Sequence, residues 1–166
     1  MSNVYASSLW AVEHMFVLAE NGAVGINFHG TFNGGNYEAI SGSSGNYVAH
    51  PLYYAMLVFH NAAQGQTIPT VVHSHRNVDV HATLASDGTL RVTAINNEAS
   101  TAVQVRIEPG RTFRSAGTLR LIGPALDATS GMTFAGNEVT PACWEQPGEH
   151  ATVRLWPTIS VPEALM

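Results

Sequence analysis

Hydrophobic positions in residues 7–20 recur every three or four residues, which predicts an amphipathic helix. We expect Ser7 or Ser8 to cap the start of this helix and Asn21-Gly22 to end it, because serine and glycine are favoured at those positions. The apolar positions that carry the pattern are Leu9, Val12, Phe16 and Ala19, with Met15 beside them.

A continuous apolar run follows this helix. Residues 23–28 read AVGINF, which predicts a short buried strand of the kind found in parallel sheets. Residues 29–50 are rich in Gly, Ser and Asn, and a connection of that length is a candidate functional loop. Pro51 then opens a second helix, which is apolar almost all round and should be buried on more than one side, and Gly65 ends it.

After Pro69 the apolar positions alternate with polar ones, which is the period of a strand. Asp87-Gly88 is a hairpin signal between the first two of these segments. About seven short strands with regular turn signals predict an antiparallel β-sandwich. The segments are 78–84, 90–94, 103–107, 119–121, 132–134, 153–155 and 158–161.

Together these elements predict a mainly β chain. It would consist of an antiparallel β-sandwich preceded by a helix–strand–helix remnant of a (β/α)8 barrel, because a lone parallel strand between two helices is one unit of such a barrel. We place the boundary near residues 66–70, with a barrel fragment in 1–66 and a sandwich domain in 67–166.

The composition of the chain argues against several classes of function. The chain of 166 residues carries a net charge of −5, and all seven of its cations are arginines, which argues against nucleic acid as a partner. No apolar run approaches the roughly 20 residues that span a bilayer, and the first ten residues do not resemble a signal peptide. The lone Cys143 cannot form an internal disulfide and says little about compartment.

Three ordered segments resemble glycoside hydrolase family 79, which contains β-glucuronidases and heparanases. They are SLWAVEHMFVLAENGAVGINFHG with GGNY, then PLYYAMLVFHNAAQG, then LRVTAINNEAS with LRLIGPALDATSGMTFAGNEV. The resemblance covers nearly the whole chain in order. It implies a retaining hydrolase in which a (β/α)8 barrel is joined to a C-terminal β-domain.

The resemblance also implies where the chemistry lies. A retaining glycosidase uses two carboxyl groups about 5–5.5 Å apart. In the family these glutamates follow the fourth and seventh barrel strands, and this chain resembles the part that begins after the seventh. We therefore expect no catalytic residue in this chain.

What remains is the wall of the sugar site formed by the eighth strand. The family's GxGNY motif binds the glucuronate carboxylate through a glycine amide and a tyrosine hydroxyl, and the matching residues here are Gly35 and Tyr37. Asn27, His29 and Gly30 stand where the predicted strand ends and could line the same cleft.

Plainer alternatives exist for several residues. Tyr37 could pack on the barrel rim, and His29 could be a structural histidine. Paired with Asp79 or His81, the two histidines His73 and His75 suggest a metal site, but they lack a third ligand with recognisable geometry, so we expect no metal or cofactor.

The remaining chemistry-bearing residues give weaker signals. The stretch Gly42-Ser43-Ser44-Gly45 is similar to the GxSxG motif but lacks both its spacing and a strand–helix elbow, which argues against a serine hydrolase. Glu13 and Glu20 are expected to face solvent, and Glu38 could fall near the cleft without a second carboxylate. Cys143 is expected to be a buried thiol, and Trp144 and Trp156 to serve packing rather than sugar binding.

The sequence thus predicts the C-terminal part of a retaining β-glucuronidase-like enzyme, inactive alone, whose partner saccharide contains glucuronate. The alternative is a separately made, non-catalytic module that binds a carbohydrate or another subunit. In either case the bare strand 24–28 predicts either a missing N-terminal barrel portion or self-association. The compartment stays open, since the resemblance is compatible with a secreted or periplasmic parent enzyme.

Overall fold

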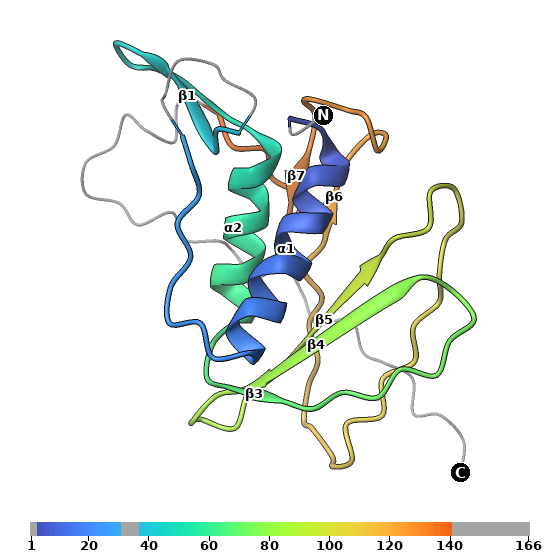
Figure 1. Ribbon diagram of the computed structural model, residues 1–166. Coiled ribbons are helices and arrows are strands. Elements are labelled where there is room, and N and C mark those ends of the chain that lie inside the picture. Colours follow the sequence, from blue (N-terminus) through green and yellow to red (C-terminus); the bar gives the residue numbers. More distant parts are fainter. Residues whose placement is uncertain (1–2, 31–36, 141–166) are drawn as a thin grey trace.

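Two helices and three small antiparallel sheets make up the computed structural model, which describes residues 3–30 and 37–140 (Figure 1). Helices and strands contribute comparable lengths, so the described part is a mixed α and β structure where the sequence suggested a mainly β one. In chain order the elements are α1 (Tyr5–Glu20), β1 (Ile40–Ser43), β2 (Asn46–Ala49), α2 (Pro51–Ala62), β3 (Gln66–Ile68), β4 (Val78–Leu84), β5 (Leu90–Asn96), β6 (Leu121–Ile122) and β7 (Thr133–Phe134).

Helix α1 forms as predicted but starts two residues earlier, and its start is not capped by serine. The Ser7 and Ser8 hydroxyls donate back to the carbonyls of Val4 and Tyr5. The first helical amides instead donate to carbonyls of residues 126 and 128, at 2.9 and 2.8 Å. Tertiary contact therefore satisfies the orphan donors that a side-chain cap would otherwise have to meet.

The end of α1 and the start of α2 agree with the sequence, whereas α2 ends at Ala62, before the predicted stop at Gly65. Gly22 adopts a positive φ of 86° and its amide donates to Ala19, which ends α1 in the expected left-handed turn. Pro51 occupies the first turn of α2, where its missing amide costs nothing.

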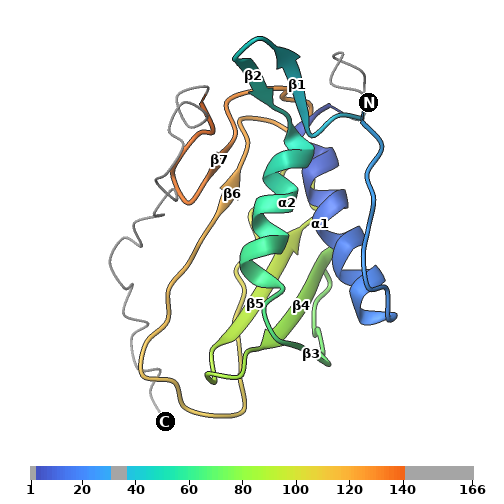
Figure 2. The ribbon, with the colours of Figure 1, turned by 90° about the vertical axis from the view of Figure 1, so that its left-hand side faces the viewer.

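The two helices run in the same direction, side by side (Figure 2). Helix α2 is buried on two sides, as its sequence predicts, because its side chains enter two separate clusters. One cluster comprises Ala11, Val12, Met15, Phe16, Leu52, Ala55 and Ile95; the other comprises Tyr54, Met132 and Phe134. The first cluster therefore includes Ile95 of β5, although the predicted domain boundary lies before that strand.

The largest sheet has the order β3–β4–β5. The predicted β4–β5 hairpin forms, with Leu84 opposite Leu90 and the turn closed around Asp87 and Gly88. The polar face of β4 meets the helices: His81 stacks on Phe16 of α1, and the Thr83 hydroxyl donates to the Ala62 carbonyl at the end of α2.

Two predicted strands are wrong. Residues 23–28 bend at Val24 and pair with no strand among the described residues, so the run AVGINF lacks the neighbours that would make it part of a sheet. Residues 103–107 also form no strand, and Val105 and Ile107 are exposed. The predicted strands at 153–155 and 158–161 lie outside the described residues, so the two-sheet sandwich stays a prediction.

The predicted functional loop contains a hairpin that the sequence analysis did not foresee. Strands β1 and β2 pair through a two-residue turn at Ser44-Gly45, where both residues have positive φ. The GSSG stretch at residues 42–45 is this hairpin end, so the structure contains no strand–helix elbow there.

Tyr5 at the start of α1 provides a pH-dependent contact. Burial raises the pKa of its phenol, whose hydroxyl donates to the Leu121 carbonyl at 3.0 Å. The ring lies flat against Gly123, where an added Cβ would lie 2.4 Å from Tyr5 Cγ.

We expect Tyr5 to make the chain alkali-sensitive. Because its native pKa lies above the unfolded value of about 10, its contribution to stability is complete below that pH and is lost as pH rises through the native pKa. Tyr5→Phe should cost about 0.5–1.5 kcal/mol at pH 7 through the lost hydrogen bond, and its unfolding free energy should fall less steeply above about pH 10. Urea titrations across this pH range test this, with Tyr37→Phe, a change at an exposed tyrosine, as the control. If the unfolding free energies of Tyr5→Phe and the parent fell equally steeply with pH above about 10, the prediction would be contradicted.

Candidate functional site

The predicted strand-end residues lie on an extended segment, residues 23–30, that returns from the end of α1 toward the start of α2 (Figures 1 and 2). Ile26 and Phe28 on this segment pack against the first core cluster. Asn27 and His29, which alternate with them, are exposed. Because successive side chains of an extended chain point to opposite sides, the apolar side faces the helices and the polar side is free.

The segment ends at a narrow neck between Gly30 and Glu38. A Cβ added to Gly30 would lie 3.9 Å from Glu38 Cγ, so the chain before and after the 31–36 stretch comes into contact here. Glu38 is only 2% exposed and engages a partner, which places it beneath the surface rather than in an open cleft.

Tyr37 stands directly before the buried Glu38 and is 67% exposed, so its ring is not packed on the body of the molecule. Gly35 lies outside the described residues. The structure thus leaves Asn27, His29, Gly30 and Tyr37 all exposed, while the neck brings Gly30 close to Glu38, the neighbour of Tyr37. Their roles in sugar binding stay predictions.

The far side of the neck is fixed to the start of α2. The His50 amide donates to the Ala39 carbonyl at 2.9 Å, and a 2.6 Å hydrogen bond joins Ser41 Oγ to His50 Nε2. Sequence analysis missed both residues, whose only signal was that His50 precedes Pro51. These contacts hold the residues that follow Tyr37 in place.

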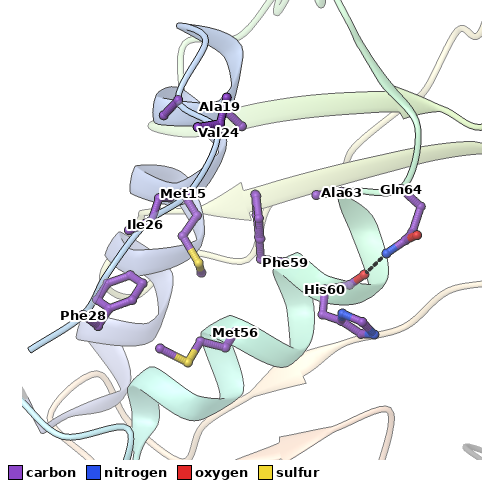
Figure 3. A pocket seen from close by; sticks show the side chains of 12 residues that line it. Met15, Ala19, Val24, Ile26, Phe28, Met56, Phe59, His60, Ala63 and Gln64 are labelled. Carbon is purple, nitrogen blue, oxygen red and sulfur yellow. Dashed lines mark hydrogen bonds between the residues drawn. The ribbon is translucent and has the colours of Figure 1, made fainter. Parts of the chain in front are cut away.

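An apolar groove of about 430 Å³ runs between the extended segment and the two helices (Figure 3). The side chains of Met15 and Met56 point toward it, and Val24 at its edge is fully exposed. Its lining contains no Asp, Glu, Lys or Arg and consists of Met15, Ala19, Ala23, Val24, Gly25, Ile26, Phe28, Met56, Phe59, His60, Ala63 and Gln64.

Glu20 is exposed at the end of α1, as expected, and it also makes a polar contact with β4. Glu20 Oε1 lies 2.8 Å from Nδ1 of the buried His81. The other ring nitrogen of His81 is buried without a hydrogen-bond partner among the described residues. His81 therefore links helix and sheet, and among the described residues it forms no metal-binding group with the exposed His73 and His75.

No group of three or more His, Cys, Asp or Glu side chains that could hold a metal occurs in residues 3–30 and 37–140. His73 and His75 lie exposed in the segment between β3 and β4. Cys143, Trp144 and Trp156 lie outside the described part of the chain.

Comparison with protein-family models, with curated proteins and with solved structures finds no match in any of the three. Within the described residues, neither helix is long and apolar enough to cross a membrane.

Proposed function

We propose that this chain is the C-terminal part of a retaining β-glucuronidase-like glycoside hydrolase of family 79. The observation that carries the proposal is the two-sided character of residues 23–30. Ile26 and Phe28 cover the helices while Asn27 and His29 face outward, as the eighth strand of a barrel would require. Two helices that run in the same direction, one before and one after a returning segment in the chain, also suit one barrel unit (Figure 2).

The chain would contribute the uronate-binding wall rather than the reacting groups. An exposed tyrosine hydroxyl at Tyr37, together with a glycine amide at Gly35, offers two neutral donors to a sugar carboxylate. Both catalytic carboxylates would belong to the barrel portion outside this chain. The isolated chain is therefore expected to hydrolyse neither aryl glucuronides nor aryl glucosides.

The alternative, a non-catalytic binding module, is favoured by a different observation. The groove in Figure 3 is open, apolar and uncharged, which suits contact with another protein surface. In the enzyme proposal the missing barrel portion covers this groove; in the alternative a separate subunit does.

Tyr37→Phe tests the uronate-binding role in an enzyme assembled from this chain and its barrel portion. Removing a hydrogen bond to a charged group typically costs about 1.5–3 kcal/mol, so KM for an aryl glucuronide should rise about 10- to 100-fold. KM for the matched aryl glucoside, which lacks the carboxylate, should change little. Steady-state kinetics on both substrates measure the difference, and an equal change in both would remove Tyr37 from the site.

The fragment proposal has its own test, independent of Tyr37. The DNA upstream of the Met1 codon should continue in frame and encode a barrel of about 250 residues with two suitably placed glutamates. A stop codon directly upstream, with its own ribosome-binding site, would instead support the binding module.

A further inference from the structure

Two histidines share one hollow in the segment that joins β3 to β4 (Figure 1). His73 and His75 are both exposed, and together with Val72 and Ser74 they line a space of about 390 Å³. Neither imidazole has a hydrogen bond, an ion pair or a ring contact with another described residue, unlike His50 and His81. The structure therefore presents two unengaged imidazoles to the same space.

The backbone that carries the two histidines is held on both sides. Thr70 Oγ1 donates to a β4 carbonyl at 2.8 Å, and the Asn77 amide donates to the Glu98 carboxylate at 3.0 Å. Between the histidines, Ser74 Oγ accepts a hydrogen bond from the Arg76 amide at 2.9 Å. A segment that is already ordered loses less conformational entropy when a ligand joins two of its side chains.

We propose that His73 and His75 form a chelating site for a divalent transition-metal ion, with Cu²⁺ bound most tightly. Residues two apart in a chain stand at most about 7 Å apart, and an imidazole nitrogen binds a metal at about 2.0–2.1 Å, so two rings that line one hollow are within reach of a shared ion. Imidazole suits zinc, nickel and copper, and Cu²⁺ has the highest affinity of these divalent ions. The described residues supply no third ligand, so water fills the remaining positions.

The charge beside the site limits which cations bind. Arg76 follows His75 directly and is exposed, and its guanidinium repels any divalent cation. A hard cation such as Mg²⁺ prefers oxygen ligands and gains little from imidazole to offset that repulsion. The site should therefore select ions with a strong preference for nitrogen.

This inference does not rest on the proposed glycosidase function. The segment between β3 and β4 lies away from the β1–β2 hairpin that follows Tyr37 (Figures 1 and 2). Copper binding is measured without any sugar, so failure of the metal site would leave the glycosidase proposal intact, and the reverse also holds.

Calorimetric titration of the full chain with CuCl₂, in a weakly coordinating buffer, tests the proposal. Every protein carries Cys143→Ser, because a thiolate is itself a copper ligand. We expect one tight Cu²⁺ per chain and a dissociation constant that rises at least about tenfold in both His73→Asn and His75→Asn, because each variant keeps a single ligand. The matched control is His29→Asn, which removes an exposed histidine of another segment and should leave the constant unchanged. MgCl₂ should neither bind at the site nor compete with Cu²⁺.

Electron paramagnetic resonance of the bound Cu²⁺ gives a readout that a merely structural role would not change. Nitrogen splittings from two imidazoles are expected in the parent and from one imidazole in each single variant. A parent that binds no copper, equal dissociation constants in the parent and both variants, a loss confined to one of the two variants, an equal loss in His29→Asn, or a bound Cu²⁺ without nitrogen splittings would each overturn the proposal.

Discussion

Phe16→Ala is expected to lower the free energy of unfolding by about 3–5 kcal/mol. Phe16 is 1% exposed and lies at the centre of the first core cluster. The centroid of its ring lies 5.0 Å from that of Phe59 in α2, which it meets edge to face. It lies 4.7 Å from the centroid of the stacked His81 ring in β4. Truncation would therefore remove contacts to both the second helix and the sheet. Urea unfolding followed by circular dichroism measures the loss.

Two further variants make the result interpretable. Phe16→Leu fills most of the space and should retain a folded chain even if Phe16→Ala does not. Val17→Ala, one position along on the exposed side of α1, should change the free energy by less than about 0.5 kcal/mol. If Phe16→Leu and Val17→Ala cost the same, α1 does not join the sheet through Phe16.

Gly65→Ala is expected to destabilise the chain by a similar amount, about 3–5 kcal/mol. Gly65 has a φ of 104°, a conformation that side chains rarely adopt. An added Cβ would also lie 2.2 Å from the Leu84 carbonyl oxygen and 2.6 Å from Ala85 Cα. Because both neighbours are backbone atoms, the clash can be relieved only by moving the end of β4 away from the end of α2.

The Gly88→Ala variant measures the cost of backbone strain without the cost of a steric clash of the added Cβ. Gly88 has a comparable φ of 86°, but an added Cβ would meet nothing within 4 Å. Its cost should be limited to the backbone strain, about 1–2 kcal/mol. Thermal or urea unfolding of both variants tests the difference, and an equal loss would show that the close approach of Gly65 to β4 is relaxed in solution.

The sequence predicted the elements whose signals are local. Both helices and the β4–β5 hairpin were found because their periodicity lies within the elements, and because their start and stop signals, such as Pro51 and Gly22, lie at or next to the element ends. The hairpin β1–β2 was missed because its signal is confined to Ser44-Gly45 within a polar stretch. The alternation in β4 did not reveal that its polar face meets the helices, since that depends on Phe16 and Glu20, about 60 residues away in the chain.

Long-range partners explain the failed predictions. The run at 23–28 has the composition of a buried strand, but a strand also needs neighbours, and the described chain supplies none. Residues 103–107 alternate correctly and still remain outside any sheet. At the candidate site, the sequence indicated exposed residues such as Asn27 and His29, whereas the burial of Glu38 against Gly30 could not be foreseen without the fold.

The neck between Gly30 and Glu38 affects how the free energy of folding responds to the number of residues between them. Its two sides already meet, and hydrogen bonds from His50 anchor the far side to α2. The entropy of closing a loop grows only slowly with its length, by about 0.6 kcal/mol per doubling. Insertions between residues 30 and 37 are therefore expected to lower the free energy of unfolding only slightly, because the contact that joins the two sides of this stretch lies outside it.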